Sequence, residues 1–301
     1  MGWFRNFLAW LRDDDVPAPA LASSPSPVTA EGRRLTIGVG VNEYLGSPEN
    51  ALRGCVNDSV NVRHELEQRG WEAPAELLFD HEATKRRTLE VIGNTCASLR
   101  TGDTLLVQWS SHGTRIHDPA EADGLLEAIC PTDAMADWPR NLVTVLDLAR
   151  ILREQVAPGA LVLLLVDACH SGVRGADAGN YARALNPLYR RARVLLGPVA
   201  AGGTRVRGLS GAVTGQVATP WSRTVLLSGC RSDQVSLDTC IAGEYQGAMT
   251  WAFLRALRWT RSERTLRELH VHMRQILTAQ GYAQEPQLLG SPPQLERRVF
   301  G

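Results

Sequence analysis

Apolar and polar residues alternate along the chain in blocks that predict strands followed by helices. Predominantly apolar runs, typical of strands buried on both faces, occur at residues 34–41, 76–80, 103–110, 160–167 and 223–229. Segments with apolar residues at helical spacing occur at residues 57–70, 83–99, 144–156, 246–258 and 264–279. This alternation predicts a mostly parallel sheet between helices, in which active groups lie beyond the carboxyl ends of the strands.

The N-terminal stretch differs from the rest of the chain. Residues 2–12 place the apolar side chains of a short helix on one face, namely Trp3, Phe4, Phe7, Leu8, Trp10 and Leu11. Residues 16–30 are rich in Pro, Ala and Ser and are typical of a linker. The helix could dock on its own domain or bind a partner protein, and its charge balance argues against membrane attachment. We assign residues 1–33 to this tethered segment and residues 34–298 to one domain.

Composition excludes several classes of function. Among 301 residues, Lys+Arg and Asp+Glu both total 32, so the basic excess of a nucleic-acid surface is absent. Six cysteines without CxxC spacing favour reduced thiols over a zinc site or a disulfide framework. No apolar run reaches the length of a membrane span, and the N-terminus lacks a secretory cleavage pattern. We therefore expect a cytoplasmic protein with no nucleic-acid partner and no transmembrane segment.

Two of the predicted strands end in clusters of reactive side chains. Residues 103–110 lead into Ser111, His112 and Gly113, and residues 160–167 lead into Cys169. If these strands are parallel neighbours, His112 and Cys169 meet at one edge of the sheet, where the imidazole can activate the thiol. The N–H groups of Gly113 and Cys169 could then form an oxyanion hole. Either residue alone could be structural, but the pair at matching strand ends favours catalysis.

These clusters resemble the paired signatures of caspase-like cysteine peptidases of family C14, specifically metacaspases and their prokaryotic relatives. The resemblance extends over roughly residues 34–290 through GCVND (54–58), DGLLEAICPTD (123–133), LLSGCRSDQVS (226–236) and GAMTWAFLRAL (247–257). It implies a caspase-like three-layer α/β/α sandwich with a mainly parallel six-stranded sheet and a Cys–His dyad. It also divides the domain into a large-subunit part (about 34–172), a loop (173–220) and a small-subunit part (about 221–298).

The resemblance further implies cleavage after arginine or lysine. In metacaspases the residues that match Asp58, Ser110 and Asp167 line the pocket for the P1 side chain. A guanidinium entering a half-buried pocket needs carboxylates within reach, and two acids would repel an acidic P1 residue. Asp58 also suits the N-terminal turn of a helix, and Asp167 could instead pin the nucleophile loop by a hydrogen bond.

The calcium site of many metacaspases is degraded in this sequence. Leu126 and the pair Val145-Leu146 stand where the family has aspartates, and the stretch VRGADAG beyond the cysteine contains Asp177 alone. Calcium takes six to eight oxygen ligands, which these apolar residues cannot supply. We predict no metal and calcium-independent activity, although three other acids could form a different weak site, namely Asp123, Glu127 and Asp133.

The segment 173–220 is rich in Gly and Arg and has no clear period. Its trio Arg190, Arg191 and Arg193 is most simply a solvated loop face. In the family this linker is often cut on activation, and basic specificity makes five arginines candidate self-cleavage positions: Arg174, Arg183, Arg191, Arg205 and Arg207. The protein could thus be a zymogen switched on by an upstream protease or by a regulatory protein. We favour a monomer that acts on protein or peptide substrates with a basic P1 residue.

Other motifs are weaker. The stretch GVGVNEYLG begins like a dinucleotide-binding loop but lacks the third glycine, and His270 and His272 point apart on a helix. The leading interpretation is a cysteine endopeptidase; the resemblance suggests regulated proteolysis, programmed cell death or antiphage defence without choosing among them. The alternatives are a catalytically silent caspase-like binding module and a non-peptidase cysteine hydrolase on the same fold.

Overall fold

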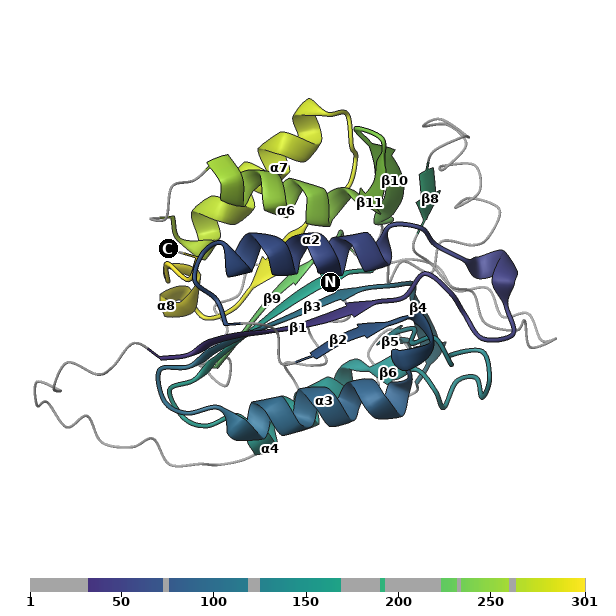
Figure 1. Cartoon of the computed structure of the whole chain (residues 1–301), viewed down its shortest axis with the longest axis horizontal. Coiled ribbons are helices and arrows are strands. Elements are labelled where there is room, and N and C mark those ends of the chain that lie inside the picture. Colours follow the sequence, from purple (N-terminus) through teal and green to yellow (C-terminus); the bar gives the residue numbers. More distant parts are fainter. Residues whose placement is uncertain are drawn as a thin grey trace, which may run out of the picture.

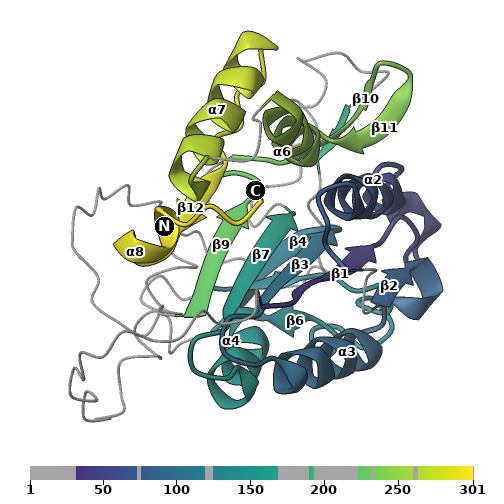
Figure 2. The ribbon, with the colours of Figure 1, turned by 60° about the vertical axis from the view of Figure 1, so that its left-hand side comes forward.

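A six-stranded sheet forms the centre of the protein in the computed structural model, which describes residues 32–72, 76–118, 125–168, 190–192 (backbone only), 223–231, 234–259 and 264–300. The strand order is β12-β9-β7-β3-β1-β2 (Figure 2). Its strands are β1 (Arg34–Gly40), β2 (Glu76–Phe79), β3 (Thr104–Ser110), β7 (Leu161–Asp167), β9 (Thr224–Ser228) and β12 (Gln287–Leu289). Neighbours from β2 to β9 are parallel, and β12 is antiparallel to β9, so the predicted mainly parallel six-stranded sheet is confirmed.

Helices cover both faces of this sheet (Figure 1). One face carries α2 (Cys55–Glu67), α6 (Ala248–Trp259) and α7 (Leu266–Ala279); the other carries α3 (Lys85–Ser98) and α4 (Val145–Gln155); the short α8 (Pro292–Leu295) follows β12. Two separate apolar cores result, one on each side of the sheet. On β7, Leu161, Leu163 and Leu165 enter one core and Val162, Leu164 and Val166 the other, which explains the uninterrupted apolar run.

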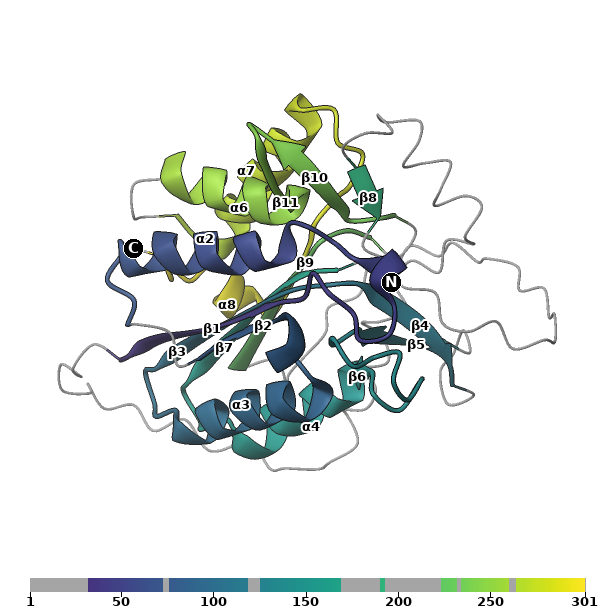
Figure 3. The same ribbon diagram turned by 45° about the vertical axis from the view of Figure 1, so that its right-hand side comes forward.

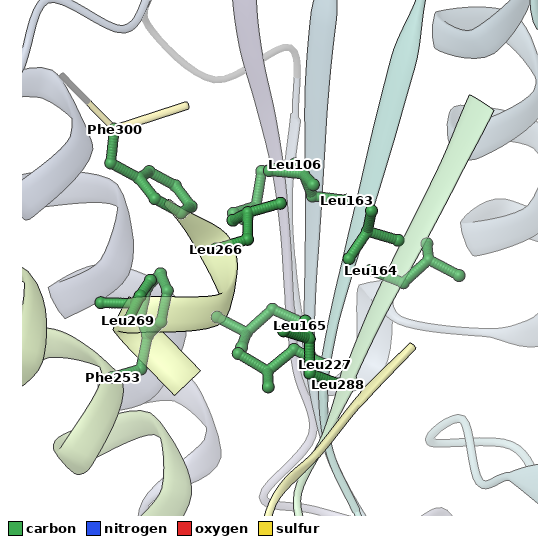
Figure 4. A pocket seen from close by; sticks show the side chains of 11 residues that line it. Leu106, Leu163, Leu164, Leu165, Leu227, Phe253, Leu266, Leu269, Leu288 and Phe300 are labelled. Atoms are coloured by element: carbon green, nitrogen blue, oxygen red, sulfur yellow. The ribbon is translucent and has the colours of Figure 1, made fainter. Parts of the chain in front are cut away.

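The core beneath α6 and α7 is filled by leucine and phenylalanine side chains (Figure 4). Phe253 of α6 and Leu266 and Leu269 of α7 face Leu165 of β7 and Leu227 of β9 across a narrow apolar pocket. Both helices therefore lie over the strands that precede and follow the segment 173–220. On the other face, α4 begins with a capping box in which Thr144 accepts a hydrogen bond from the Asp147 N–H.

Helix α2 lies directly on the glycines of β1. A Cβ atom built on Gly40 would be 2.6 Å from the carbonyl oxygen of Cys55 and 2.8 Å from the Cα of Val56. A Cβ atom on Gly38 would approach the Ser59 Cβ to 3.2 Å. The first turn of α2 is therefore held against the carboxyl end of β1, which is the edge where the sequence predicts the active groups.

Two three-stranded sheets lie at the same end of the molecule (Figures 1 and 3). One contains β4 (Gly113–His117), β5 (Leu125–Ile129) and β6 (Val143–Thr144); the other has the order β11-β10-β8, with β8 (Arg190–Ala192), β10 (Leu237–Ile241) and β11 (Glu244–Gly247). These short strands mix polar and apolar residues, so the apolar pattern did not predict them. The assignment of Arg190 and Arg191 to a loop is wrong, because their backbone pairs antiparallel with β10.

The predicted helices occur with shifted ends. The first begins at Cys55 instead of Asn57, and the helix expected from residue 246 begins at Ala248, because Glu244–Gly247 belong to the β10–β11 hairpin. Within the described ranges, none of the helices combines the length and the apolar character needed to cross a bilayer.

Candidate active site

Strands β3 and β7 end side by side at the carboxyl edge of the main sheet. Ser110 and Asp167, the last residues of these strands, are Cα partners in the parallel register. Just beyond them, the N–H of Ser111 donates to the carbonyl oxygen of Asp167 at 3.4 Å. His112 follows Ser110 by two positions, and Cys169 follows Asp167 by two positions. The two sequence motifs therefore start from adjacent points, although Cys169 itself lies outside the described residues.

The imidazole of His112 is buried and held through one of its nitrogens. Its Nε2 atom lies 2.8 Å from the carbonyl oxygen of Asn50, in the 3₁₀ turn Pro48–Asn50. A carbonyl oxygen can only accept a hydrogen bond, so Nε2 carries the proton of the neutral ring. This assignment leaves Nδ1 with the lone pair that a general base needs.

The peptide groups on both sides of His112 are also held. The Tyr44 hydroxyl oxygen accepts a hydrogen bond from the His112 N–H at 2.8 Å, and the two ring centroids are 5.1 Å apart. The carbonyl oxygen of His112 accepts from the Cys130 N–H at 2.9 Å. Sequence reasoning missed both Tyr44 and Asn50. It tested GVGVNEYLG (38–46), which contains Tyr44, only as a dinucleotide-binding loop, and Asn50 acts through its main-chain carbonyl oxygen.

Gly113 begins β4 opposite Ile129 of β5. The bond from Cys130 to His112 flanks this pair, which makes Gly113 and Ile129 a non-hydrogen-bonded pair of the antiparallel ladder. The N–H of Gly113 is consequently directed away from β5. This orientation suits a backbone donor for an oxyanion.

The two predicted specificity acids are fully buried, and both accept hydrogen bonds from backbone N–H groups at the start of α6. Asp58, in the first turn of α2, accepts a hydrogen bond from the Gly247 N–H at its Oδ1 atom, at 2.8 Å. Asp167 accepts at Oδ2 from the N–H of Thr250 at 3.0 Å and from its hydroxyl at 2.8 Å. Its Oδ1 accepts from the hydroxyl of Ser236. Carboxylates are favoured at a helix N-terminus, where backbone N–H groups lack partners within the helix.

Ser110, the third predicted specificity residue, belongs to a buried polar chain. Its hydroxyl oxygen accepts from the Gln108 side-chain amide at 2.7 Å, and the Gln108 amide oxygen accepts from the hydroxyl of Ser59 on α2. Gln108 and Ser110 are two positions apart on β3 and therefore face the same side as α2. Asp58, Ser110 and Asp167 thus share one face of the sheet at its carboxyl edge.

A further carboxylate fastens the β10–β11 hairpin to the start of α2. Asp238 of β10 accepts from the N–H groups of Arg53 and Gly54 at 2.9 and 3.0 Å. The side-chain amide of Asn57 donates to the carbonyl oxygen of Tyr245 at 2.8 Å. Asp238 is also the Cα partner of Arg191 in β8. Arg174, Arg183, Arg205 and Arg207, the other candidate self-cleavage positions, lie outside the described residues.

The described positions of the family's calcium ligands do not fit calcium, and Asp177 lies outside the described residues. Leu126 and Val145 are buried in the apolar core beneath α3 and α4, and Leu146 packs against it. Glu127 forms an ion pair with Arg115 at 2.9 Å, and the Asp133 carboxylate accepts from the Lys85 N–H at 2.9 Å. Asp123 lies outside the described residues. In the described part of the chain, no three His, Cys, Asp or Glu side chains form a metal-binding group.

Two of the buried thiols outside the site are unreactive near neutral pH. Cys55, Cys96, Cys130 and Cys230 are buried, and Cys240 is half-buried. Burial raises the pKa of the Cys96 thiol to about 12 and that of Cys130 well above its ordinary value. Neither forms a thiolate near neutral pH, so neither competes for the role of nucleophile.

Sequence comparison matches this chain to known proteins over most of its length. The model of the caspase domain matches residues 33–295. A metacaspase-1 from Mycosarcoma maydis is 28% identical over 298 residues, covering 87% of this chain and 71% of that protein. A metacaspase-1 from Meyerozyma guilliermondii is 30% identical over 297 residues, covering 87% and 70%.

Solved structures show the same fold. Protein GSU0716 from Geobacter sulfurreducens superposes with a TM-score of 0.62 at 21% identity, covering 89% of this chain and 98% of that one. Caspase-1 from Spodoptera frugiperda gives a TM-score of 0.55 at 14% identity, covering 90% and 94%. Together with the family match, this shared architecture confirms the caspase-like sandwich that the sequence predicted. The chain belongs to the caspase-domain family of cysteine peptidases.

Proposed function

We propose that this protein is a cysteine endopeptidase that cleaves after arginine or lysine through a Cys169–His112 dyad. The observation that carries the proposal is the hydrogen bond between His112 Nε2 and the Asn50 carbonyl oxygen. It directs the proton to Nε2 and leaves the lone pair that a base needs on Nδ1, at the rim where the strand leading to Cys169 also ends. The hydrogen bonds that the His112 main chain makes with the Tyr44 hydroxyl and the Cys130 N–H also support the role of His112 as the base.

The proposed reaction proceeds through an acyl-enzyme. Nδ1 of His112 takes the thiol proton, and the Cys169 sulfur attacks the scissile carbonyl carbon. The N–H groups of Gly113 and Cys169 stabilise the oxyanion. When the tetrahedral intermediate collapses, the C–N bond breaks and His112 returns its proton to the leaving amine. His112 then takes a proton from water, whose oxygen attacks the thioester carbon, and the carboxylic product leaves as the thiol is restored.

The preference for a basic P1 side chain is proposed from Asp58, Ser110 and Asp167. All three are fully buried on one face of the sheet at its carboxyl edge, next to the strand ends that lead to the dyad. A buried pair of carboxylates favours a guanidinium or ammonium group and opposes an acidic one. Their hydrogen bonds to the start of α6 fix the positions of the two acids before substrate binds.

Calcium-independent activity is part of the proposal. Apolar side chains occupy the positions of the family's ligands, and the remaining acids Glu127 and Asp133 already bind Arg115 and the Lys85 N–H. The hydroxyl of Thr144 and the ammonium of Lys85 both contact Asp147, the acid that follows the missing pair. No step of the reaction is assigned to a metal ion.

Activation by cleavage within residues 173–220 is supported by β8. The backbone of Arg191 lies opposite Asp238 in the antiparallel register. Asp238 in turn holds the start of α2, one turn before Asp58. Self-cleavage at Arg191, or at any of the other four candidate positions, would be seen by mass spectrometry in the wild type and not in Cys169→Ala.

A monomeric state is proposed from the edge of the main sheet. The edge strand β12 has only three residues, and Pro286 precedes it while Pro292 and Pro293 begin the helix that follows. Short edge strands flanked by proline resist pairing with a second sheet. Gel filtration of the purified chain, with Cys169→Ala used to prevent cleavage, would measure the state directly.

Peptide cleavage tests the main proposal. A matched set of peptides with P1 Arg, Lys, citrulline or Asp is assayed with calcium and with a chelator, and Cys169→Ala is the blank. We expect the Arg and Lys peptides to be cleaved faster than the citrulline peptide and the Asp peptide not to be cleaved, with less than about twofold effect of the chelator. No turnover of any peptide by the intact or self-cleaved chain would instead favour a binding module, and cleavage after Asp would contradict the pocket.

A further inference from the structure

The carboxylate of Asp167 is the centre of a buried hydrogen-bond network drawn from distant segments. Ser236 precedes β10 and donates to Oδ1, while Thr250 in the first turn of α6 donates twice to Oδ2. Gln284, between α7 and β12, donates to the Ser236 hydroxyl oxygen at 3.3 Å. All four residues are buried. The network therefore links the end of β7 to three parts of the C-terminal half of the chain.

The hydrogen bonds of this network have a defined direction. An ionised carboxylate only accepts, so the Ser236 hydroxyl must donate to Asp167 and can then only accept from Gln284. Gln284 is fixed at its other end, because its amide oxygen accepts from the Leu237 N–H at 3.1 Å. Its amide nitrogen also donates to the Gly229 carbonyl oxygen at 3.0 Å. Chains of aligned hydrogen bonds strengthen one another in a buried setting.

The backbone leaves this network little room to rearrange. A Cβ atom built on Gly229 would lie 2.5 Å from the Ser236 hydroxyl oxygen and 3.2 Å from Asp167 Oδ1. The N–H and the hydroxyl of Thr250 both donate to Asp167 Oδ2, so the backbone and the side chain of Thr250 hold this oxygen together. The orientation of the Asp167 carboxylate is thus set by the C-terminal half of the chain.

We propose that Thr250, Ser236 and Gln284 are positioning residues for substrate selection, which hold the Asp167 carboxylate in the orientation that receives a cationic P1 side chain. A buried carboxylate is costly without donors, and a rotated one presents its charge in the wrong direction. This inference rests on the function proposed above and extends it to residues that never touch the scissile bond. It predicts that selection for charge can be lost while the dyad stays intact.

The test compares two peptides that differ only in P1 charge, one with arginine and one with its neutral isostere citrulline. Thr250→Val keeps the side-chain shape and the N–H but removes the hydroxyl donor, and Ser236→Ala removes the other donor. We expect each variant to lower kcat/KM for the arginine peptide about tenfold, equivalent to about 1.4 kcal/mol, with the citrulline value unchanged. Thr250→Ser restores the hydroxyl and should restore the ratio.

A matched control is Thr88→Val. Thr88 is a fully buried threonine of α3 on the opposite face of the sheet, and its hydroxyl has no hydrogen-bond partner in the described part of the chain. It should leave the arginine-to-citrulline ratio unchanged. Thermal unfolding of every variant separates loss of fold, which lowers both rates together, from loss of selection. If Thr250→Val fails to fold, Ser236→Ala carries the test.

Three outcomes are distinguishable. Wild-type enzyme that cleaves the arginine peptide no better than the citrulline peptide contradicts the proposed function, and this inference with it. Wild-type enzyme with a clear preference, which Thr250→Val and Ser236→Ala retain, overturns this inference alone. An equal fall of the ratio in Thr88→Val would likewise assign the effect to general packing and reject a positioning role.

Discussion

His112 Nε2 lies 2.8 Å from the carbonyl oxygen of Asn50, a residue 62 positions earlier in the chain. The proposed base is therefore oriented by a main-chain group, where other hydrolases use a carboxylate side chain. A neutral acceptor stabilises the imidazolium less than an anion does. The ring orientation must accordingly depend on the backbone contacts that hold His112 itself.

Removal of the Tyr44 hydroxyl should slow turnover. Tyr44→Phe keeps the ring that packs against the imidazole but removes the acceptor for the His112 N–H. We expect kcat to fall about fivefold with KM little changed, because one hydrogen bond contributes about 1 kcal/mol. Steady-state kinetics with an arginine peptide measure the effect. Tyr245→Phe, which removes a surface hydroxyl that contacts Arg53, is the control, and an equal loss there would contradict the prediction.

The two buried acids should respond differently to conversion into amides. In Asp58→Asn the amide oxygen can still accept from the Gly247 N–H, whereas in Asp167→Asn an NH₂ group must face the donors of Ser236 or Thr250. We expect Asp167→Asn to lower the free energy of unfolding by about 2 kcal/mol and Asp58→Asn by less than about 1 kcal/mol.

Both changes should lower kcat/KM for an arginine peptide about a hundredfold, because each removes one negative charge from the pocket. Urea unfolding and peptide kinetics provide the two measurements. The reverse order of stability, or undiminished cleavage after arginine in both variants, would be incompatible with the hydrogen bonds and the role described for these acids.

Alkylation should distinguish the nucleophile from the other thiols. Burial holds the pKa of Cys96 at about 12 and that of Cys130 well above its ordinary value, so neither should react with iodoacetamide at pH 7.5. Cys169 and the half-buried Cys240 should be modified, and inactivation should follow modification of Cys169 alone. Peptide mass mapping identifies the sites. Cys240→Ser should remain fully active and equally sensitive to the reagent; protection of Cys169 would argue against its role.

Acid should weaken the attachment of α2 to α6 through Glu65. Burial alone would raise the pKa of the Glu65 carboxyl, but hydrogen bonds from Arg258 and Arg69 outweigh it, and the pKa lies below its ordinary value of 4.5. A lowered pKa stabilises the fold above the unfolded-state value, and this stabilisation is lost as the pH falls through the folded-state value.

We therefore expect Glu65→Gln to lower the free energy of unfolding by about 2 kcal/mol at pH 7. The difference from wild type should be smaller at pH 3. Urea unfolding at the two pH values measures this. Glu67→Gln is the control on the same helix, because its ion pair with Arg63 is half-exposed and should contribute less than about 1 kcal/mol. A difference in unfolding free energy between wild type and Glu65→Gln that is as large at pH 3 as at pH 7 would disprove the ion-pair explanation.

The sequence predicts the strands β1, β3, β7 and β9 because both of their faces are buried, which leaves a largely apolar run. The edge strand β2 is only partly buried and is predicted from a short apolar run. The sequence also predicts the strand ends that carry His112 and the acids. The strand β12 has three residues, and the hairpin β10–β11 alternates polar and apolar positions, so neither produces a comparable signal. Both become strands only because a neighbouring segment supplies the partner.

Part of the site could not be predicted from the sequence. Asn50 acts through its carbonyl oxygen, a group that every residue possesses, so its identity carries no information about this contact. Thr250 and Gln284 reach Asp167 and Ser236 only because α6 and the segment before β12 fold over β7. Their positions are a property of the tertiary packing.

Strand β9 pairs with β7 along its whole length, although residues 168–223 separate them in the chain. A break anywhere in that stretch would leave each piece without a complete hydrophobic interior of its own, since α6 and α7 rest on strands from both. The nicked molecule should therefore elute as one particle under native conditions and separate into two polypeptides only in detergent. A cut in this stretch would therefore leave the six-stranded sheet and its two apolar cores joined.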